Sequence, residues 1–293
     1  MTWSIEGKTV LITGGNSGIG RETAVGLARM GAQLTFTSRD RGRGEEALAD
    51  VRERSGRDDV ELMELDLASF ASIRRFAAQY LERHERLEVL VNNAGLILGD
   101  RRETEDGFEA TFGTNHLGHF LLTDLLLERI RASAPARIVN LSSRAHRYAR
   151  SGLDFDDLMS EKGYAGLRVY GKSKLANILF TRELARRLEG ANVTANAVHP
   201  GGVRTGFARD GDVKGLYGRL VALAGPFLRT PEKGAETSIY VASSPELEGV
   251  SGKYFANSKE TATTAAGRDD EAAGRLWQVS EELVAKAGAQ SGA

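Results

Sequence analysis

The feature that most constrains the fold is a glycine-rich segment between a short apolar run and an amphipathic one. Residues 8–12 are apolar and β-branched and predict a strand, and residues 13–20 (TGGNSGIG) follow at once. A helical pattern continues to Met30, Gly31 fits the helix end, and residues 33–37 predict a second strand. A strand, a helix and a strand within about 30 residues close as a right-handed crossover, so the two strands are expected to be parallel.

Short apolar strands and amphipathic helices continue to alternate along most of the chain. Further strands are predicted at residues 60–64, 87–91, 137–141 and 193–198, and helices at 41–54, 69–84, 106–131 and 166–189. This alternation is typical of a doubly wound parallel sheet with helices on both faces. The sequence therefore predicts an α/β protein of the Rossmann type, with a single domain over residues 1–293.

The alternation breaks after residue 202. Residues 206–230 combine Gly, Arg and scattered apolar side chains and are expected to form a lid over the open edge of the sheet. A helix is then predicted from Pro231, a last strand at 252–255 followed by an exposed polar stretch, and a helix at 270–287. Residues 288–293 are expected to fray.

Composition excludes several classes of function. The 39 basic and 40 acidic residues give a net charge of −1, which provides no field to attract nucleic acid or an anionic membrane. The absence of cysteine excludes disulfides, thiolate metal ligands and a cysteine nucleophile. The N-terminal residues lack the pattern of a secretory signal, and no apolar run reaches the roughly 20 residues of a membrane-spanning helix. A cytoplasmic protein without a nucleic-acid partner is expected.

The glycine-rich segment lies where a dinucleotide pyrophosphate binds in such sheets. Glycine lets the backbone approach phosphates, and the helix that follows supplies unpaired N–H donors. A tight connection between a strand and a helix is the alternative explanation. Three residues separate Gly14 from Gly18, and Gly20 follows, so this loop is wider than the common G-x-G-x-x-G pattern.

Tyr170 and Lys174 lie four residues apart on the predicted helix 166–189 and therefore project from one face. A neighbouring ammonium lowers the pKa of a tyrosine from about 10 toward neutral pH, so the phenol can exchange a proton with an alcohol or a carbonyl. The same spacing arises by chance on amphipathic helices, and a surface pair is the alternative.

Further polar groups follow two predicted strands. The sequence Asn-Asn-Ala-Gly at residues 92–95 ends one strand, Asn115 lies in the next helix, and Ser142 and Ser143 end the following strand. Ligands of open α/β sheets bind at the carboxyl ends of the strands. These groups are therefore expected to converge with the glycine loop and the Tyr–Lys pair in one crevice.

Together these motifs resemble the short-chain dehydrogenase/reductase family. The resemblance covers about residues 7–256 and rests, in chain order, on TGGNSGIG, NNAG, Asn115, the serine pair, YGKSK and HPGGV. The segments NHLGHFLLT, VNLSSRAHRY and YGKSKLANILF are similar to the retinol-dehydrogenase-like and WW-domain-oxidoreductase-like branch. The resemblance implies an NAD(P)-dependent oxidoreductase that acts on an alcohol/carbonyl pair.

The resemblance also implies a catalytic tetrad. Tyr170 would be the acid/base, and Lys174 would hold the nicotinamide ribose and lower the pKa of the tyrosine. Ser143 would orient the substrate oxygen, and Asn115 would hold a relay water. Ser143 is preferred to Ser142 because the acting hydroxyl of the family follows the first serine of this strand end, with a slip of one residue left open.

The same resemblance implies a set of cofactor-binding residues. Asp66 would contact the adenine, or else cap the next helix, and the NNAG residues would form the wall beside the ribose. The turn at Pro200 would bring backbone groups to the nicotinamide carboxamide, or else be an ordinary strand-end turn. The full expected set is Gly14, Asn16, Ser17, Gly18, Ile19, Gly20, Arg39, Asp66, Leu67, Asn93, Ala94, Gly95, Tyr170, Lys174, Pro200, Gly201, Val203 and Thr205.

The end of the predicted strand 33–37 carries the choice between the two nicotinamide dinucleotides. An acidic residue there accepts hydrogen bonds from the ribose 2′-hydroxyl of NAD, and a basic residue pairs with the 2′-phosphate of NADP. Arg39 comes first after the strand, and Asp40 follows it. NADP(H) is the preferred prediction and NAD(H) the alternative, and Arg39 could instead only cap the adjacent surface.

Three further expectations concern partners. His116 and His119 are three residues apart on a predicted helix, but no acidic or cysteine partner accompanies them, so no metal site is predicted. A lipophilic aldehyde, ketone or retinoid-like molecule is expected as substrate, and a homodimer or homotetramer through the helices after the fourth and fifth strands. A non-catalytic NAD(P)-binding sensor or scaffold and a C=C reductase of the same family are the alternatives.

Overall fold

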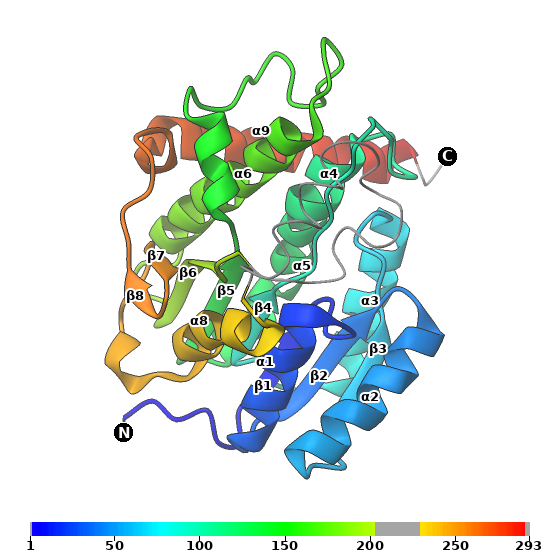
Figure 1. Cartoon of the computed structure of the whole chain (residues 1–293), viewed down its shortest axis with the longest axis vertical. Coiled ribbons are helices and arrows are strands. Elements are labelled where there is room, and N and C mark those ends of the chain that lie inside the picture. The colour runs from blue at the N-terminus through cyan, green and yellow to red at the C-terminus, as the bar shows by residue number, and fades with distance from the viewer. Residues whose placement is uncertain (1, 203–228, 291–293) are drawn as a thin grey trace.

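The computed structural model describes residues 2–202 and 229–290, and it contains one eight-stranded sheet (Figure 1). The strand order is β3-β2-β1-β4-β5-β6-β7-β8; the neighbours from β3 to β7 pair in parallel, and β8 is antiparallel to β7. The strands are β1 (Thr9–Ile12), β2 (Gln33–Ser38), β3 (Glu61–Glu64), β4 (Val89–Asn92), β5 (Ala136–Leu141), β6 (Val193–His199), β7 (Tyr254–Ala256) and β8 (Lys259–Glu260). The predicted doubly wound α/β fold is confirmed.

Helices cover both faces of the sheet because the strand side chains alternate. In β1, Val10 and Ile12 pack in the core beneath α1, α2 and α8, whereas Leu11 packs in the core beneath α3, α5 and α6. The long helices are α1 (Gly18–Arg29), α2 (Arg41–Ser55), α3 (Phe70–Arg83), α5 (Gly118–Ala132), α6 (Gly166–Arg187), α8 (Pro231–Ser243) and α9 (Asp270–Gln290). The short ones are α4 (Ala110–Phe112), the π-helical turn η1 (Gly113–Leu117), and the 3₁₀ turns η2 (Arg144–Ala149), η5 (Pro245–Leu247) and η6 (Ala266–Arg268).

The order in which strands are added to the sheet reverses between β1 and β4. From β1 the chain adds β2 and β3 on one side, and β4 then returns to pair with β1 on the other. The loops after β1 and β4 consequently leave the sheet edge in opposite directions and open a crevice between them. This is the position at which the sequence places the glycine loop.

The predicted helix 106–131 begins later than expected. Residues 106–109 are not helical: Gly107 has a φ of +80°, and Glu109 forms an isolated bridge with Glu103. The carboxylate of Glu109 instead accepts hydrogen bonds from the backbone N–H groups of Thr111 and Phe112, so it caps the helix. The helix is then interrupted by η1, which contains Asn115.

The last predicted strand also differs. Gly252 has a φ of +73°, which breaks extended geometry, so β7 covers Tyr254–Ala256 rather than 252–255. The polar stretch after it contains β8, because Asn257 and Ser258 both adopt positive φ and close a two-residue hairpin turn. The sequence pattern did not predict this antiparallel strand.

Helix α9 covers the outer side of α6 and reaches α5. Trp277 of α9 stacks on Phe180 at 5.7 Å between ring centres and meets Phe120 edge-on at 5.0 Å. Residues 173–181 of α6 are all buried, which requires cover on the side opposite the sheet. The chain's own C-terminal helix therefore covers part of the surface through which the sequence predicts a dimer, while Asp124, Glu128 and Arg131 of α5 remain exposed.

Some expectations fall wholly or partly outside the described residues. Of the expected lid at 206–230, only Arg229 and Thr230 are described, and Val203 and Thr205 lie outside as well. α9 extends to Gln290, beyond the predicted helix end at residue 287.

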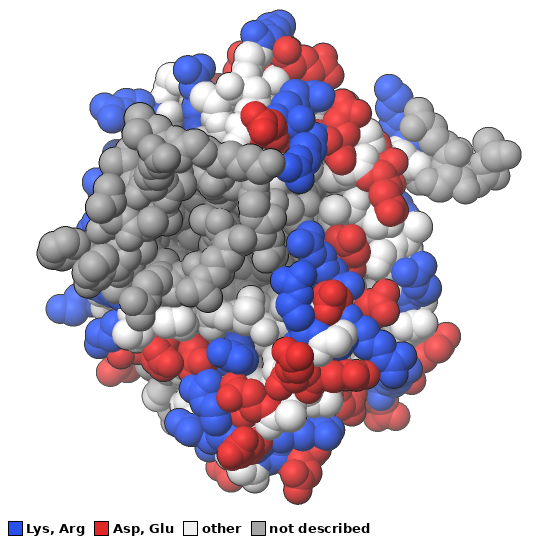
Figure 2. Space-filling view, turned by 45° about the vertical axis from the view of Figure 1, so that its right-hand side comes forward, with Lys and Arg blue, Asp and Glu red and all other residues white. Residues whose placement is uncertain are grey.

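Two further observations concern the distribution of charged side chains on the surface and the length of apolar helices. On the face shown in Figure 2, acidic and basic side chains are interspersed. Within residues 2–202 and 229–290, no helix is both long enough and apolar enough to span a membrane.

Candidate active site

The loop after β1 forms a cradle that has no room for a side chain at two of its glycines. Gly14 has a φ of +66°, and a Cβ on Gly20 would collide with the carbonyl oxygen of Gly14 and the amide of Asn93. Ser17 is the N-cap of α1, but its side chain makes no capping hydrogen bond. The first backbone N–H groups of α1 are therefore left for an anionic ligand, as a pyrophosphate requires.

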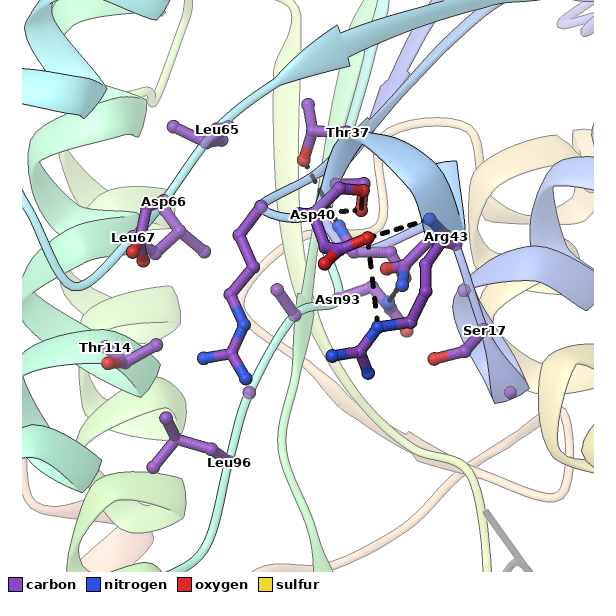
Figure 3. A pocket seen from close by; sticks show the side chains of 18 of the residues that line it. Ser17, Thr37, Asp40, Arg43, Leu65, Asp66, Leu67, Asn93, Leu96 and Thr114 are labelled. Atoms are coloured by element: carbon purple, nitrogen blue, oxygen red, sulfur yellow. Dashed lines mark hydrogen bonds and ion pairs between the residues drawn. The ribbon is translucent and has the colours of Figure 1, made fainter. Parts of the chain in front are cut away.

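The cradle opens into a cleft of about 230 Å³ at the crevice between β1 and β4. In Figure 3, Ser17 and Arg43 lie on one side of it, and Leu65, Asp66, Leu67, Leu96 and Thr114 lie on the other. Twelve of the predicted cofactor residues line this cleft: Gly14, Asn16, Ser17, Gly18, Ile19, Gly20, Arg39, Asp66, Leu67, Asn93, Ala94 and Gly95.

One buried polar atom in the cleft wall has no protein partner. The hydroxyl oxygen of Thr114 is buried and has no hydrogen-bond partner among the described residues. Buried hydroxyls are almost always satisfied, so a ligand in the cleft is the natural partner. This orphaned group and the glycine cradle fit a dinucleotide.

Two cationic side chains lie at the cleft, just after the carboxyl end of β2. Arg39 and Arg43 both line it. The carboxylate of Asp40 accepts a hydrogen bond of 2.8 Å from the backbone N–H of Arg43 and so caps α2. Asp40 therefore holds the helix start; its carboxylate also lies 3.9 Å from the Arg43 guanidinium, and the residue lines the cleft.

Asp66 does not cap the helix that follows it. The N-cap of α3 is Ser69, whose hydroxyl accepts a hydrogen bond from the backbone N–H of Ser72. The Asp66 carboxylate accepts one from Ala68 at 2.9 Å and lines the cleft. The alternative of a simple helix cap is thus not what the structure contains.

Asn115 fastens the wall of the cleft to α6. Its Oδ1 accepts a hydrogen bond of 2.8 Å from the backbone N–H of Leu96, and its Nδ2 donates to the Leu96 carbonyl at 2.9 Å and to the Ser173 hydroxyl at 3.0 Å. Asn115 is itself fully buried. The side chain consequently has a fixed orientation.

The Lys174 side chain reaches the same wall of the cleft. It is buried, its Nζ donates to the Leu141 carbonyl at 3.1 Å, and Leu141 lines the cleft. A Cβ added to Gly95 would lie 3.4 Å from Nζ and 3.0 Å from Asn115 Oδ1. Burial lowers the pKa of Lys174 to about 7, because the ammonium loses hydration.

Tyr170 lies one turn before Lys174 on α6, and the lysine Nζ is 5.5 Å from the centre of its ring. The helix packs closely on η2 at Gly171, where a Cβ would lie 2.6 Å from the Ala145 carbonyl oxygen. η2 begins directly after Ser143, so α6 and the strand end are held against each other.

The two serines at the end of β5 have different surroundings. The hydroxyl of Ser142 is buried and donates a hydrogen bond of 2.8 Å to the backbone carbonyl of Lys174. The hydroxyl of Ser143 accepts a hydrogen bond from the Ala145 N–H, and the residue is only partly buried. Its proton remains available for a ligand, whereas that of Ser142 is committed to the helix.

The turn after β6 holds the remaining described residues of the predicted set. Gly201 has a φ of +92°, and its N–H points to the His199 ring at 3.4 Å. Pro200 is buried at the strand end, and neither it nor Gly201 lines the dinucleotide cleft.

The two histidines considered as metal ligands have separate partners. His116 contacts Ser280 of α9 at 3.0 Å, and His119 contacts Thr13 at 2.9 Å.

The cleft also contains residues that sequence reasoning missed. They are Thr37, Ser38, Arg43, Leu65, Leu96, Thr114 and Leu141; Asp40, considered from the sequence as the residue that would favour NAD, lines it as well. For Arg43 a signal existed: Asp40 is a good N-cap, and the first turn of a helix that starts there returns residue 43 to the same side.

A fold of this topology with a Tyr–Lys pair at the end of a dinucleotide cleft defines a short-chain dehydrogenase. The short chain dehydrogenase family model matches residues 8–154 and 158–213, and the chain belongs to this family. It is an NAD(P)-dependent oxidoreductase that acts on alcohol or carbonyl groups.

Individual relatives are similar over nearly the whole chain. Human retinol dehydrogenase 14 is 50% identical over 294 residues, which cover 96% of this chain and 87% of that protein. A crystal structure of an uncharacterised protein from Mycobacterium paratuberculosis is 35% identical with a TM-score of 0.76, covering 97% of this chain and 95% of that one. An NADP complex of RhlG from Pseudomonas aeruginosa is 28% identical with a TM-score of 0.68, covering 86% and 95%. The predicted retinol-dehydrogenase-like branch is confirmed.

Proposed function

We propose that this chain interconverts a lipophilic aldehyde or ketone and its alcohol with NADP(H), through Tyr170, Lys174, Ser143 and Asn115. The observation that carries the proposal is the position of the buried Lys174 ammonium. It lies at the Gly95 end of the dinucleotide cleft and one helical turn from Tyr170. A surface pair, the alternative explanation for this spacing, does not account for a fully buried lysine.

Each catalytic side chain has a distinct task in this proposal. The bound nicotinamide supplies hydride in reduction and receives it in oxidation. Tyr170 gives a proton to the carbonyl oxygen in reduction and removes it from the alcohol in oxidation, and the Lys174 charge stabilises the phenolate that remains. Ser143 donates a hydrogen bond to the same oxygen, where negative charge develops. Asn115 holds a relay water for this proton in the proposal, and its side chain also fixes the wall of the cleft at Leu96.

A preference for NADP(H) is supported by the charges at the end of β2. Arg39 and Arg43 line the cleft, while the Asp40 carboxylate caps α2. Two guanidinium groups can pair with a 2′-phosphate, and charge-assisted bonds of this kind are the strong ones. A free carboxylate would favour the 2′-hydroxyl of NAD instead.

The substrate class is proposed from the relatives. Several of them, about half identical to this chain, are named retinol dehydrogenases, so retinaldehyde and retinol are the first pair to test. The experiment measures NADPH consumption with retinaldehyde and with shorter lipophilic aldehydes and ketones. An alcohol product with all C=C bonds retained supports the proposal. A saturated C=C bond would establish the alternative reductase, and NADPH binding without turnover would establish the sensor.

Assembly and location are separate parts of the proposal. A homodimer or homotetramer through α5 and α6 stays a proposal, with α9 covering part of that surface. Light scattering combined with cross-linking tests it: cross-links between copies that map to α5 and α6 would support it, and a monomer would contradict it. A cytoplasmic location stays a prediction.

A further inference from the structure

A buried histidine joins the cofactor cleft to the turn that carries Asn115. His119, on the first turn of α5, is only 2% exposed. Its Nε2 lies 2.9 Å from the Thr13 hydroxyl, at the end of β1, and its Nδ1 lies 3.1 Å from the backbone carbonyl oxygen of Asn115. Both ring nitrogens are therefore used inside the protein.

The direction of these hydrogen bonds follows from the surroundings of Thr13. Its hydroxyl oxygen accepts hydrogen bonds from the backbone N–H groups of Asn93 at 2.9 Å and Ala94 at 3.0 Å. With its acceptor capacity filled, the hydroxyl donates its one proton. The His119 Nε2 at 2.9 Å is a better acceptor position than the Val91 carbonyl at 3.5 Å.

The tautomer of His119 is then fixed. An Nε2 that accepts from Thr13 leaves the proton of a neutral imidazole on Nδ1, which donates it to the Asn115 carbonyl. The neutral form is the one that burial favours: it lowers the pKa of His119 to about 3, with a smaller contribution from the Lys174 charge. The ring thus keeps one donor and one acceptor throughout the working pH range.

Two parts of the site meet at this ring. On the Thr13 side are Asn93 and Ala94, which line the cleft; the Asn93 amide also donates to the Thr13 carbonyl at 2.8 Å. On the other side is Asn115, in a π-helical turn whose backbone hydrogen bonds run from residue i to i+5. The His119 ring gives the Asn115 carbonyl a side-chain contact in addition to the backbone of this turn.

We propose that His119 is a positioning residue: it fixes the cleft wall at Asn93 and Ala94 and the Asn115 carbonyl relative to each other. This rests on the proposed function, in which the wall binds NADP(H) and the Asn115 turn serves proton transfer. The Thr13 bond keeps the wall in place for the dinucleotide, and the Asn115 bond ties the same ring to the turn that carries Asn115. The two bonds should therefore affect different kinetic parameters.

Two amide variants separate the bonds. In His119→Asn the side-chain amide nitrogen can take the place of Nδ1, so the donor to Asn115 is kept and the acceptor for Thr13 is lost. In His119→Gln the amide oxygen can take the place of Nε2, so the acceptor for Thr13 is kept and the donor to Asn115 is lost. His119→Phe removes both bonds at similar volume, and His84→Phe is the control for loss of a partly buried histidine away from the site.

The measurements are the NADPH dissociation constant by equilibrium titration, kcat with retinaldehyde, and Tm. A single lost hydrogen bond corresponds to about tenfold in an equilibrium or rate constant. We expect His119→Asn to weaken NADPH binding about tenfold with kcat nearly retained, and His119→Gln to lower kcat about tenfold with NADPH binding nearly retained. His119→Phe should show both losses, and His84→Phe only a lower Tm.

Two results would overturn the proposal. One is that both amide variants keep the NADPH affinity and the kcat of wild type. The other is the same loss of both parameters in both variants, in proportion to Tm, as a general loss of packing would give. If wild-type protein turns over no carbonyl substrate, the proposed function fails; the contrast in NADPH affinity between His119→Asn and His119→Gln then still decides the positioning role.

Discussion

The Nζ atom of Lys174 lies so close to Gly95 that a methyl group on the glycine would stand 3.4 Å from it. The same methyl would stand 3.0 Å from Oδ1 of Asn115, which two hydrogen bonds to Leu96 hold in place. The wall of the dinucleotide cleft and the proton-transfer groups therefore meet without spare room. The sequence motif that ends β4 thus lines the cleft and also contacts the Asn115 side chain.

Replacing Gly95 by alanine tests this close approach. The added methyl would stand 3.0 Å from Asn115 Oδ1, so the Asn115 side chain and its hydrogen bonds to Leu96 must shift, and we expect kcat/KM with NADPH to fall at least tenfold. The free energy of unfolding should change by no more than about 1–2 kcal/mol, which chemical denaturation measures. Gly274→Ala is the control, because nothing lies within 4 Å of a Cβ there. Full activity in Gly95→Ala would show that the two groups do not share this contact.

Arg39 and Arg43 are predicted to set the preference for NADP. Each charge-assisted bond to the 2′-phosphate contributes about 1.5–3 kcal/mol, so Arg39→Ala or Arg43→Ala should lower kcat/KM for NADPH about tenfold to a hundredfold and leave NADH nearly unchanged. Arg41→Ala is the matched control on the same helix, because Arg41 pairs with Glu45 and does not line the cleft. Equal losses with both cofactors would refute a role in the preference.

The pKa of Lys174 predicts proton uptake when the cofactor binds. With a pKa lowered to about 7, the free protein carries mostly neutral Lys174 at pH 8. The bound dinucleotide is anionic and raises the pKa of the lysine, so binding takes up a proton. The 2′-phosphate is already ionised at this pH and does not contribute. Calorimetry in two buffers of different ionisation enthalpy should show uptake of about 0.5–1 proton in wild type and none in Lys174→Met. The same uptake in both proteins would assign the proton to another group.

Two buried histidines predict that the fold loses stability in acid. Burial lowers the pKa of His116 and of His119 to about 3 from 6.5, so the unfolded chain binds protons below pH 6.5 that the folded protein does not bind. Stability is therefore complete above pH 6.5 and falls as the pH decreases from there toward 3. At pH 5.5 the loss is about 1 kcal/mol for each histidine relative to pH 7.5. Urea unfolding at these two pH values measures it, and His119→Gln should remove the share of one ring, about 1 kcal/mol, while His116 and His199 keep theirs. A flat profile in wild type would mean that both rings are protonated in the fold.

Local sequence patterns were sufficient to predict the β1–loop–α1 unit and the strands of the parallel sheet. They failed where the backbone depends on a single residue: Glu109 caps the helix that contains η1 and so starts it late, and Asn257 and Ser258 make the turn to β8. Neither a side-chain cap by glutamate nor a hairpin without glycine is a strong sequence signal.

The candidate site also contains a part that the sequence predicted and a part that it did not. Strand-end motifs predicted the residues of the cleft because parallel strands bring their carboxyl ends to one edge. Contacts that join distant segments were not predictable. The tie from His119 to Thr13 spans 106 residues, and only the fold reveals it. The packing of α9 on α6 is another contact between distant segments that the sequence did not predict.

The most direct test of the account is retinaldehyde reduction by Tyr170→Phe, with NADPH affinity measured on the same protein. Loss of the phenol hydroxyl removes the proton donor and leaves the cleft intact, so kcat should fall by about 10²–10⁴. The NADPH dissociation constant should stay within about threefold of wild type, a shift below 1 kcal/mol. A variant that reduces retinaldehyde as fast as wild type would contradict the assignment of Tyr170 as the acid and base of this enzyme.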